Sequence, residues 1–406
     1  MRFCMVTTFY PPYHFGGDAT YVRSLSRALV ELGHEVEVIH CEDAFHTVNK
    51  GSETSHDTND EGITVHRLKN RFGFLSALIT QQTGRPGLKA GKLRTLLDRD
   101  FDVVNFHNIS LVGGPGVLAM SKAPITLYTL HEHWLVCPTH ILWKNRSHAC
   151  DGRTCFTCSL RSAIPPQLWR YTGLINRSLE NVDMLLSPSE FTAQQHRDGG
   201  IECPIQILKM FSSLDPGSEI DEELIGRPKF IYAGRMTASK GIASLLEVFS
   251  DLDDCELLVL GEGDLRLPLQ QQYADKKNIK FMGFVPQAEL VSIYKGASAL
   301  LYPSLAPEAF ALGVPEAYAC GLPTIVRDAG ANKAHIDATG AGFVYRTQDE
   351  LRQAIKKIAS DRELRLELGR KARSGYEKYY TKKQHLDNYL NCISDISKKK
   401  GIRLPQ

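Results

Sequence analysis

The chain has no apolar run that approaches the roughly 20 consecutive residues a membrane-spanning helix needs. A formal net charge of only +2, without a long Lys/Arg run, gives no indication of nucleic-acid binding. The N-terminal stretch MRFCMVTTFYPP is too short and too polar for a secretory signal, so we expect a cytoplasmic location. No period of roughly 20–50 residues recurs, which argues against a solenoid.

Cysteine is too sparse for a disulfide scaffold, with ten in 406 residues, and six of these lie in or beside apolar runs. The other four form a cluster in the polar loop 134–162: Cys137, Cys150, Cys155 and Cys158. Four thiolates within one short loop can close a tetrahedral zinc site, so we expect a structural zinc there. The alternatives are an iron–sulfur cluster, disulfides in an oxidising compartment, and free thiols.

Composition is that of a soluble globular protein with two or three domains, 43% hydrophobic and 23% charged. The first segment reads as a strand over Arg2–Thr8, then a glycine loop at Gly16 and Gly17, then a helix, then a strand over Val36–His40. This order is the first βαβ unit of a doubly wound parallel sheet. The two glycines at the helix N-terminus allow the backbone to approach an anion closely.

Two further apolar runs, Phe101–His107 and Ile125–Thr129, are expected to be buried parallel strands. His131 and Glu132 follow the second run, and His107 ends the first, at the sheet edge where doubly wound folds bind ligands. Farther along, Trp169–Val182 is expected to be a helix.

The second half starts with an apolar strand and a glycine-bearing turn that contains Arg235 and Lys240. This cation pair suits a diphosphate, because Arg binds two oxygens at once and Lys acts as a point charge. A solvated turn is the alternative. The later Gly261-Glu262-Gly263 lacks the third glycine of a dinucleotide fingerprint, so that function is poorly supported.

The stretch Leu301–Asp328 places two carboxylates, Glu308 and Glu316, on either side of a predicted helix N-terminus. Carboxylate oxygens accept hydrogen bonds from sugar hydroxyls, and free N–H groups at a helix start attract phosphate. An ordinary βαβ unit with two solvated glutamates is the alternative.

The pair Glu308-x7-Glu316 is followed by a small set of motif residues: Ala317, Cys320, Gly321 and Pro323. Together they resemble the signature of retaining nucleotide-sugar glycosyltransferases of family 4, which have the GT-B fold. The family usually has glycine where this chain has Ala309 and Ala311. The resemblance is sharpest over about 230–345 and extends more weakly over the N-terminal half.

The resemblance implies an α/β protein of two Rossmann-like, doubly wound domains that face each other across a cleft. We expect residues 1–210 to form the acceptor-side domain, with a C-terminal helix (381–406) that crosses back to it. Residues 211–380 would form the nucleotide-sugar domain, and the stretch 211–227 would be the linker.

The resemblance also implies residue roles. The catalytic residues are expected to be His131, Glu308, Arg235 and Lys240. The donor is expected to contact the glycine loop, the cation pair, a strand end beside the base, and the central stretch: Gly16, Gly17, Arg235, Lys240, Phe284, Val285, Glu308, Phe310, Ala311, Leu312 and Glu316.

The implied reaction moves a hexosyl group from a UDP or GDP sugar to a hydroxyl acceptor (a glycan, a lipid or a small-molecule glycoside) with retention of configuration. Protein cations would stabilise the leaving diphosphate, so no catalytic metal is expected. Two alternatives stay open: a catalytically weak GT-B scaffold that serves as a docking module, and a nucleotide-sugar epimerase of the same architecture.

Segment 69–94 joins the apolar run Phe72–Ile79 to flanking basic residues. Such a helix can make peripheral contact with a membrane surface, but the pattern more often indicates a half-buried helix with solvated ends.

Overall fold

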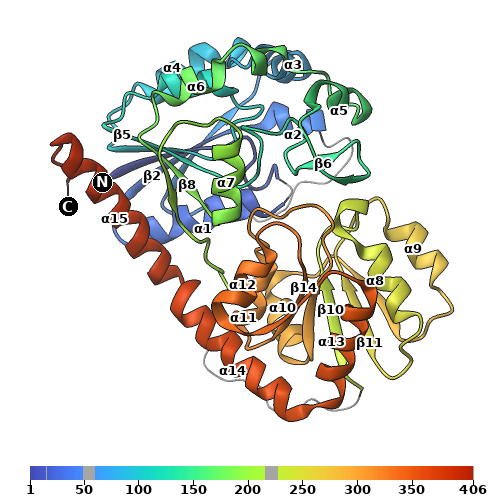
Figure 1. The fold of residues 1–406 in the computed structure, drawn as a ribbon. Coiled ribbons are helices and arrows are strands. Elements are labelled where there is room, and N and C mark those ends of the chain that lie inside the picture. Colours follow the sequence, from blue (N-terminus) through green and yellow to red (C-terminus); the bar gives the residue numbers. More distant parts are fainter. Residues whose placement is uncertain (15, 49–59, 215–226, 406) are drawn as a thin grey trace. The chain divides into compact units, whose positions relative to one another are not determined.

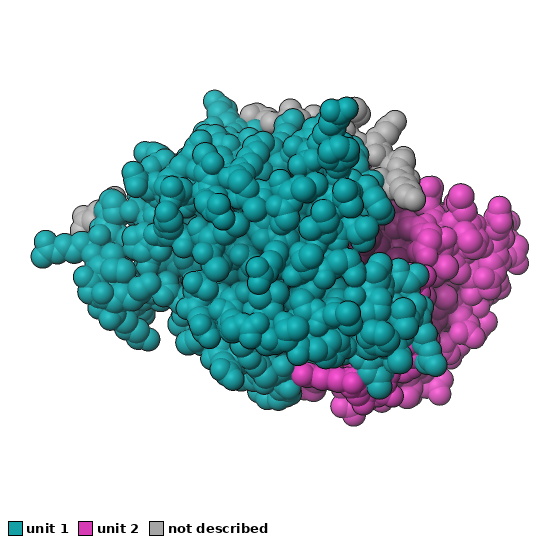
Figure 2. Space-filling model, turned by 90° about the horizontal axis from the view of Figure 1, so that it is seen from above, with its two compact units in different colours: residues 1–140, 154–208, 386–406 teal, residues 141–153, 209–385 magenta. Residues whose placement is uncertain are grey.

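The computed structural model describes residues 1–14, 16–48, 60–214 and 227–405, so most of the predicted linker lies outside the described residues. The chain divides into two compact units, coloured separately in Figure 2. Unit 1 comprises residues 1–140, 154–208 and 386–406. Unit 2 comprises residues 141–153 and 209–385, so a short insertion from the first half of the chain belongs to the second unit.

Unit 1 is built on a parallel seven-stranded sheet of order β3-β2-β1-β4-β5-β8-β9 (Figure 1). Apart from its edges, the strands are rich in apolar residues and mostly buried, as parallel sheets with covered faces require. The strands are β1 (Arg2–Val6), β2 (Glu35–Cys41), β3 (Ile63–Leu68), β4 (Val103–Phe106), β5 (Ile125–Thr129), β8 (Met184–Ser187) and β9 (Ile205–Ile207).

Helices pack on both faces of this sheet, with α3, α4 and α6 along one face and α1 on the other (Figure 1). The α-helices are α1 (Gly17–Glu31), α2 (Glu42–Val48), α3 (Gly73–Thr83), α4 (Ala90–Leu97), α5 (Cys155–Arg161), α6 (Leu174–Leu179), α7 (Glu190–Asp198) and α15 (Lys382–Lys400). Short 3-10 helices are η1 (Gly87–Lys89), η2 (Pro115–Met120) and η3 (Leu168–Tyr171).

The C-terminal helix α15 packs on unit 1 from residue 386 onward, as predicted. The buried Asn105 amide on β4 donates to the Tyr389 hydroxyl at 3.1 Å, and the Tyr389 ring packs against Phe3. Near the helix end, Lys400 forms an ion pair with Asp183 at 2.8 Å.

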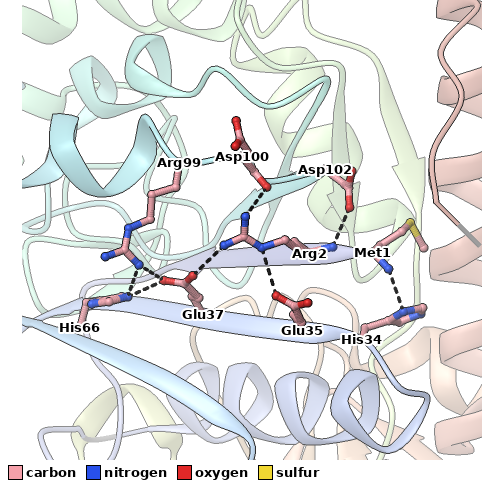
Figure 3. Close-up of polar contacts among 9 residues, drawn as sticks. All are labelled: Met1, Arg2, His34, Glu35, Glu37, His66, Arg99, Asp100 and Asp102. Atoms are coloured by element: carbon pink, nitrogen blue, oxygen red, sulfur yellow. Dashed lines mark hydrogen bonds and ion pairs between the residues drawn. The ribbon is translucent and has the colours of Figure 1, made fainter.

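A charged network joins the first three strands of unit 1 (Figure 3). Arg2 contacts Glu35 at 3.1 Å and Glu37 at 3.3 Å. Glu37 also contacts His66 at 2.5 Å and Arg99 at 2.6 Å. Because the contacting residues belong to different strands, the network links β1, β2 and β3 to one another.

Unit 2 repeats the architecture with a parallel six-stranded sheet of order β12-β11-β10-β13-β14-β15. The strands are β10 (Lys229–Ala233), β11 (Glu256–Leu260), β12 (Ile279–Gly283), β13 (Ala299–Tyr302), β14 (Thr324–Arg327) and β15 (Gly342–Tyr345). The helices are η4 (Ala238–Lys240), α8 (Ile242–Phe249), α9 (Arg266–Gln272), α10 (Gln287–Lys295), α11 (Gly313–Ala319), α12 (Asn332–Thr339), α13 (Gln348–Ser360) and α14 (Arg362–Tyr379). The insertion forms an antiparallel hairpin of β6 (Trp143–Lys144) and β7 (His148–Ala149).

The helix predicted over Trp169–Val182 is wrong as a single element. The structure has η3, then Gly173 in the left-handed region at φ 70°, then α6. A helix cannot continue through that conformation, so the segment splits into two short turns of helix. No helix within the described residues is long and apolar enough to cross a membrane.

Candidate functional site

In each sheet the order in which successive strands are added reverses at one point. This point lies between β1 and β4 in unit 1 and between β10 and β13 in unit 2. In doubly wound folds, ligands bind beside the carboxyl ends of the strands at this point. The predicted site residues follow those strand ends or those of neighbouring strands. The glycine loop and His131 lie on unit 1, and the remaining residues predicted for catalysis and donor binding lie on unit 2.

The centre of the unit 2 site is an ion pair between Lys240 and Glu308. Lys240 Nζ lies 2.6 Å from Glu308 Oε1, and both side chains are largely buried, with 26% and 14% exposed. The Ser304 hydroxyl donates to the same carboxylate oxygen. The structure therefore brings together two residues that are 68 positions apart and were predicted to share a site.

Backbone contacts hold the β10 and β13 loops against each other. The Ser239 carbonyl accepts hydrogen bonds from the N–H groups of Leu305 at 2.8 Å and Ala306 at 3.0 Å. Gly241 has φ 70°, and a Cβ there would lie 2.1 Å from the Pro303 carbonyl oxygen. Glycine at this position is thus required for the close approach that pairs Lys240 with Glu308.

Arg235 is exposed in the loop that follows β10 and that also carries Lys240. Its carbonyl accepts a hydrogen bond from the Tyr232 hydroxyl at 2.7 Å. Burial raises the pKa of Tyr232 well above its usual value; the Glu308 carboxylate raises it further, and the Arg235 guanidinium opposes this. Arg235 and Glu308 are therefore both near enough to this phenol to affect its pKa.

Glu316 lies in the first turn of α11 and is half-buried. Burial raises the pKa of its carboxyl to about 7. Among the residues that the structure describes, none is seen to donate a side-chain hydrogen bond to it. A carboxylate that is costly to ionise gains much from hydroxyl donors on a ligand.

Two residues of the central stretch that were predicted to contact the donor have buried side chains. Phe310 is 6% exposed, and its ring packs edge-on against His335 with centroids 4.9 Å apart. Ala311 is 3% exposed and has φ 32°, a conformation that favours glycine. Leu312 follows as the N-cap of α11. Only the backbone of Phe310 and Ala311 is therefore expected to face a ligand.

Replacing Ala311 by glycine should leave stability unchanged or raise it by up to about 1 kcal/mol. Relief of the positive-φ strain offsets the larger entropy of the unfolded chain. Ala309, which has no positive φ, is the matched control: Ala309→Gly should cost about 0.4–1 kcal/mol. Urea unfolding of both variants checks this; equal destabilisation by the two would show that Ala311 is unstrained.

Phe284 and Val285 follow β12, as predicted for base neighbours. The Phe284 ring is 75% exposed, and its N–H donates to Glu262 Oε1 at 3.2 Å. Glu262 also pairs with Arg266 at 3.1 Å. The Phe284 ring is thus available for stacking, while the Phe284 backbone N–H already donates to the Glu262 side chain.

The unit 1 site centres on two histidines at the ends of β4 and β5. His107 Nδ1 lies 2.9 Å from His131 Nε2, and the Tyr21 ring packs edge-on against both. Burial lowers the pKa of His131 to about 3 and that of His107 well below its usual value. His131 Nδ1 is buried and has no hydrogen-bond partner within the described ranges.

Sequence reasoning placed Glu132 at this sheet edge but missed a second carboxylate of unit 1, Asp18. Asp18 accepts from the Asn108 amide at 3.3 Å, and Glu132 lies 2.7 Å from His140 Nδ1. Burial and the Glu132 charge raise the pKa of Asp18 to about 6. Asp18 directly follows the glycine loop, and that position in the first turn of a helix is the signal that could have identified it.

His131→Gln should make the protein less sensitive to acid. A depressed pKa means that the stabilising contribution is present above the unfolded value of about 6.5 and is lost as the pH falls toward 3. Between pH 7.5 and 5.5 the wild type should lose about 1.4 kcal/mol more unfolding free energy than the variant. Urea unfolding at both pH values measures the difference, and identical losses would contradict the assignment of a buried neutral histidine.

The four clustered cysteines do not form a recognisable metal site. Cys137 and Cys158 are buried and Cys155 is half-buried in unit 1, whereas Cys150 is exposed in the hairpin of unit 2. Over residues 1–14, 16–48, 60–214 and 227–405, no three His, Cys, Asp or Glu side chains are arranged to hold a metal ion. The zinc site stays a prediction without geometric support.

Two family models match the chain. The model described as "Glycosyltransferase Family 4" matches residues 15–209, and "Glycosyl transferases group 1" matches residues 219–375. An uncharacterized glycosyltransferase of Methanocaldococcus jannaschii is 23% identical over 405 residues, which covers 93% of this chain and 94% of that protein.

Solved structures share the fold over nearly the whole length. Sucrose-phosphate synthase from Thermosynechococcus elongatus has a TM-score of 0.74 at 18% identity, covering 97% of this chain and 98% of that one. The Anabaena protein HepE, solved in complex with UDP and glucose, has a TM-score of 0.67 at 15% identity, covering 97% and 100%.

Proposed function

Because the chain belongs to the family 4 glycosyltransferases, which have the GT-B fold, we propose that it transfers a hexosyl group from a nucleoside-diphosphate sugar to a hydroxyl acceptor with retention of configuration. The observation that carries the proposal is the Lys240–Glu308 pair beside Arg235 at the switch point of the unit 2 sheet. The similarity to a protein solved with UDP and glucose supports a nucleotide-sugar donor.

Arg235 and Lys240 are proposed to bind the donor diphosphate and to stabilise the charge that develops as it leaves. Lys240 has three donors, so it can hold Glu308 and a phosphate oxygen at the same time. Fixed cations in a partly buried site stabilise a transition state without reorganising, which is usually the largest single term in catalysis. We therefore propose that the transfer step needs no divalent cation.

The carboxylates are proposed to bind hydroxyls on the two sides of the diphosphate. Glu316 accepts from the ribose, while Glu308, whose position is fixed by Lys240 and Ser304, accepts from the transferred sugar. A carboxylate has about four lone-pair sites, so Glu308 keeps capacity after these two bonds.

His131 is proposed to orient the transferred sugar as a neutral hydrogen-bonding group. Its low pKa leaves it uncharged near neutral pH, so it can orient a hydroxyl group without adding a further positive charge. The acceptor proton is proposed to pass to the leaving phosphate, in a front-face displacement that requires no protein base.

A panel of nucleoside-diphosphate sugars tests donor binding by thermal shift. A ligand at 100 times its Kd stabilises the native state by about 2.7 kcal/mol, which is readily measured. Stabilisation by at least one UDP or GDP sugar is expected. A docking module need bind none of them, and an epimerase would convert the bound sugar without any acceptor.

A further inference from the structure

Unit 1 exposes large apolar side chains that gather on α3, η1, α5 and η3. Eight of them are between 45% and 65% exposed: Phe72, Phe74, Leu75, Leu88, Phe156, Leu160, Leu168 and Tyr171. Scattered single exposed apolar residues are normal, but a group on adjoining elements marks an interaction surface. We call this group the apolar surface.

Hydrogen bonds, one of them fully buried, connect α3 with η1, with η3 and with the segment between α5 and η3. The Lys89 ammonium, 3% exposed, donates to the Thr80 hydroxyl at 2.8 Å and so fixes η1 to α3. The Trp169 indole donates to the Gln81 carbonyl at 2.9 Å, and the Gln81 amide donates to the Pro165 carbonyl at 2.8 Å. Helices α3 and α5 lie at the same end of unit 1 in Figure 1. The apolar surface is therefore a supported feature of the folded unit.

The segments that carry the apolar surface are rich in cations. Residues 62–97 and 152–179 include all eight apolar residues and contain seven and four Lys/Arg, respectively, but no Asp or Glu. Exposed Arg71, Arg85 and Arg161 have no ion pair in the part of the chain that the structure describes. The neighbouring Glu42 is 5% exposed and already pairs with Lys69 at 2.6 Å.

We propose that the apolar surface docks onto an anionic lipid bilayer, with the aromatic and leucine side chains in the headgroup region and the arginines on lipid phosphates. Exposed apolar side chains flanked by cations are typical of surfaces that bind anionic bilayers. A second copy of the chain fits poorly, because an isologous contact would bring the same unpaired cations face to face. The proposal is independent of the donor site on unit 2.

Vesicle co-sedimentation tests the proposal on the full-length protein. We expect binding to vesicles of phosphatidylcholine with 30% phosphatidylglycerol, by about 10-fold or more over phosphatidylcholine alone, weakening as salt is raised. Each cation near an anionic surface contributes about five-fold in binding, so Arg71→Glu with Arg85→Glu should weaken it by roughly 25-fold or more. Phe72→Ser with Phe74→Ser should weaken it about 10-fold or more, because two rings are removed from the interface.

Matched double variants control for net charge and for lost apolar area. Lys356→Glu with Arg362→Glu makes the same charge change on unit 2, and Leu32→Ser with Leu267→Ser removes side chains that are 51% and 66% exposed elsewhere. Both controls should bind vesicles as the wild type does, and all variants should bind a nucleotide sugar normally. The proposal would be overturned by equal affinity for neutral and anionic vesicles, or by equal losses in the test and control variants. It would also be overturned if the protein did not bind vesicles and instead self-associated or captured an acidic protein.

Discussion

Lys240→Ala should lower kcat about 10²–10³-fold while changing the Kd for the donor far less. The ammonium is fixed 2.6 Å from Glu308, so it is already in place when charge develops on the leaving diphosphate. Removing one such preorganised group typically costs about 2.7–4 kcal/mol of transition-state stabilisation. Single-turnover kinetics and calorimetric donor binding, measured on the same preparation, separate the two effects.

Lys280→Ala is the matched control for this prediction. Lys280 also pairs with a glutamate of unit 2, Glu256 at 2.8 Å, but on the β11 and β12 strands instead of in the loops of the site. It should keep normal turnover. Near-normal kinetics for Lys240→Ala, or the same loss in both variants, would contradict the proposal that Lys240 binds the diphosphate.

Glu316→Gln should weaken donor binding about 30-fold, because charged hydrogen bonds to a ligand contribute about 1.5–3 kcal/mol. The wild type should also bind with a pH dependence that the variant lacks. Burial raises the pKa of Glu316 to about 7, so only about a tenth of the carboxyl is ionised at pH 6 and most of it at pH 8. Donor affinity should therefore rise about 10-fold between these pH values.

The intact nucleotide sugar is the correct probe for Glu316, because a terminal phosphate titrates near pH 6 and would add its own pH dependence. Glu289→Gln, an exposed change on α10, is the matched control and should bind as the wild type does at both pH values. A wild-type affinity that is flat from pH 6 to pH 8 would show that Glu316 does not bind the donor as a carboxylate.

Much of the fold could be predicted because buried parallel strands are continuous apolar runs. The strand expected at Ile125–Thr129 is β5 within the same bounds. The prediction of one helix over Trp169–Val182 was wrong because Gly173 adopts a left-handed conformation, which the spacing of apolar residues does not reveal. Strand β3 was missed for a different reason: only two of its six residues are buried at the sheet edge, so its sequence is less apolar and gives no clear strand signal.

The site could be predicted only in part. Lys240 and Glu308 were placed together because each lies in a recognisable motif beside a strand end, and the sheet order then makes those ends neighbours. Asp18 and Glu132 lie 114 positions apart and belong to no shared motif, so the effect of the Glu132 charge on the pKa of Asp18 emerges only from the folded sheet. The Phe310 side chain was assigned to the donor, yet its ring serves the core.

The most direct test of the central claim is nuclear magnetic resonance of the reaction with an α-linked nucleotide sugar and a pool of hydroxyl acceptors. Family membership and the paired cations predict acceptor-dependent release of the nucleoside diphosphate and an α-linked product, both lost in Lys240→Ala. A β-linked product would contradict retention of configuration. Conversion of the nucleotide sugar into its epimer without any acceptor would contradict glycosyl transfer itself.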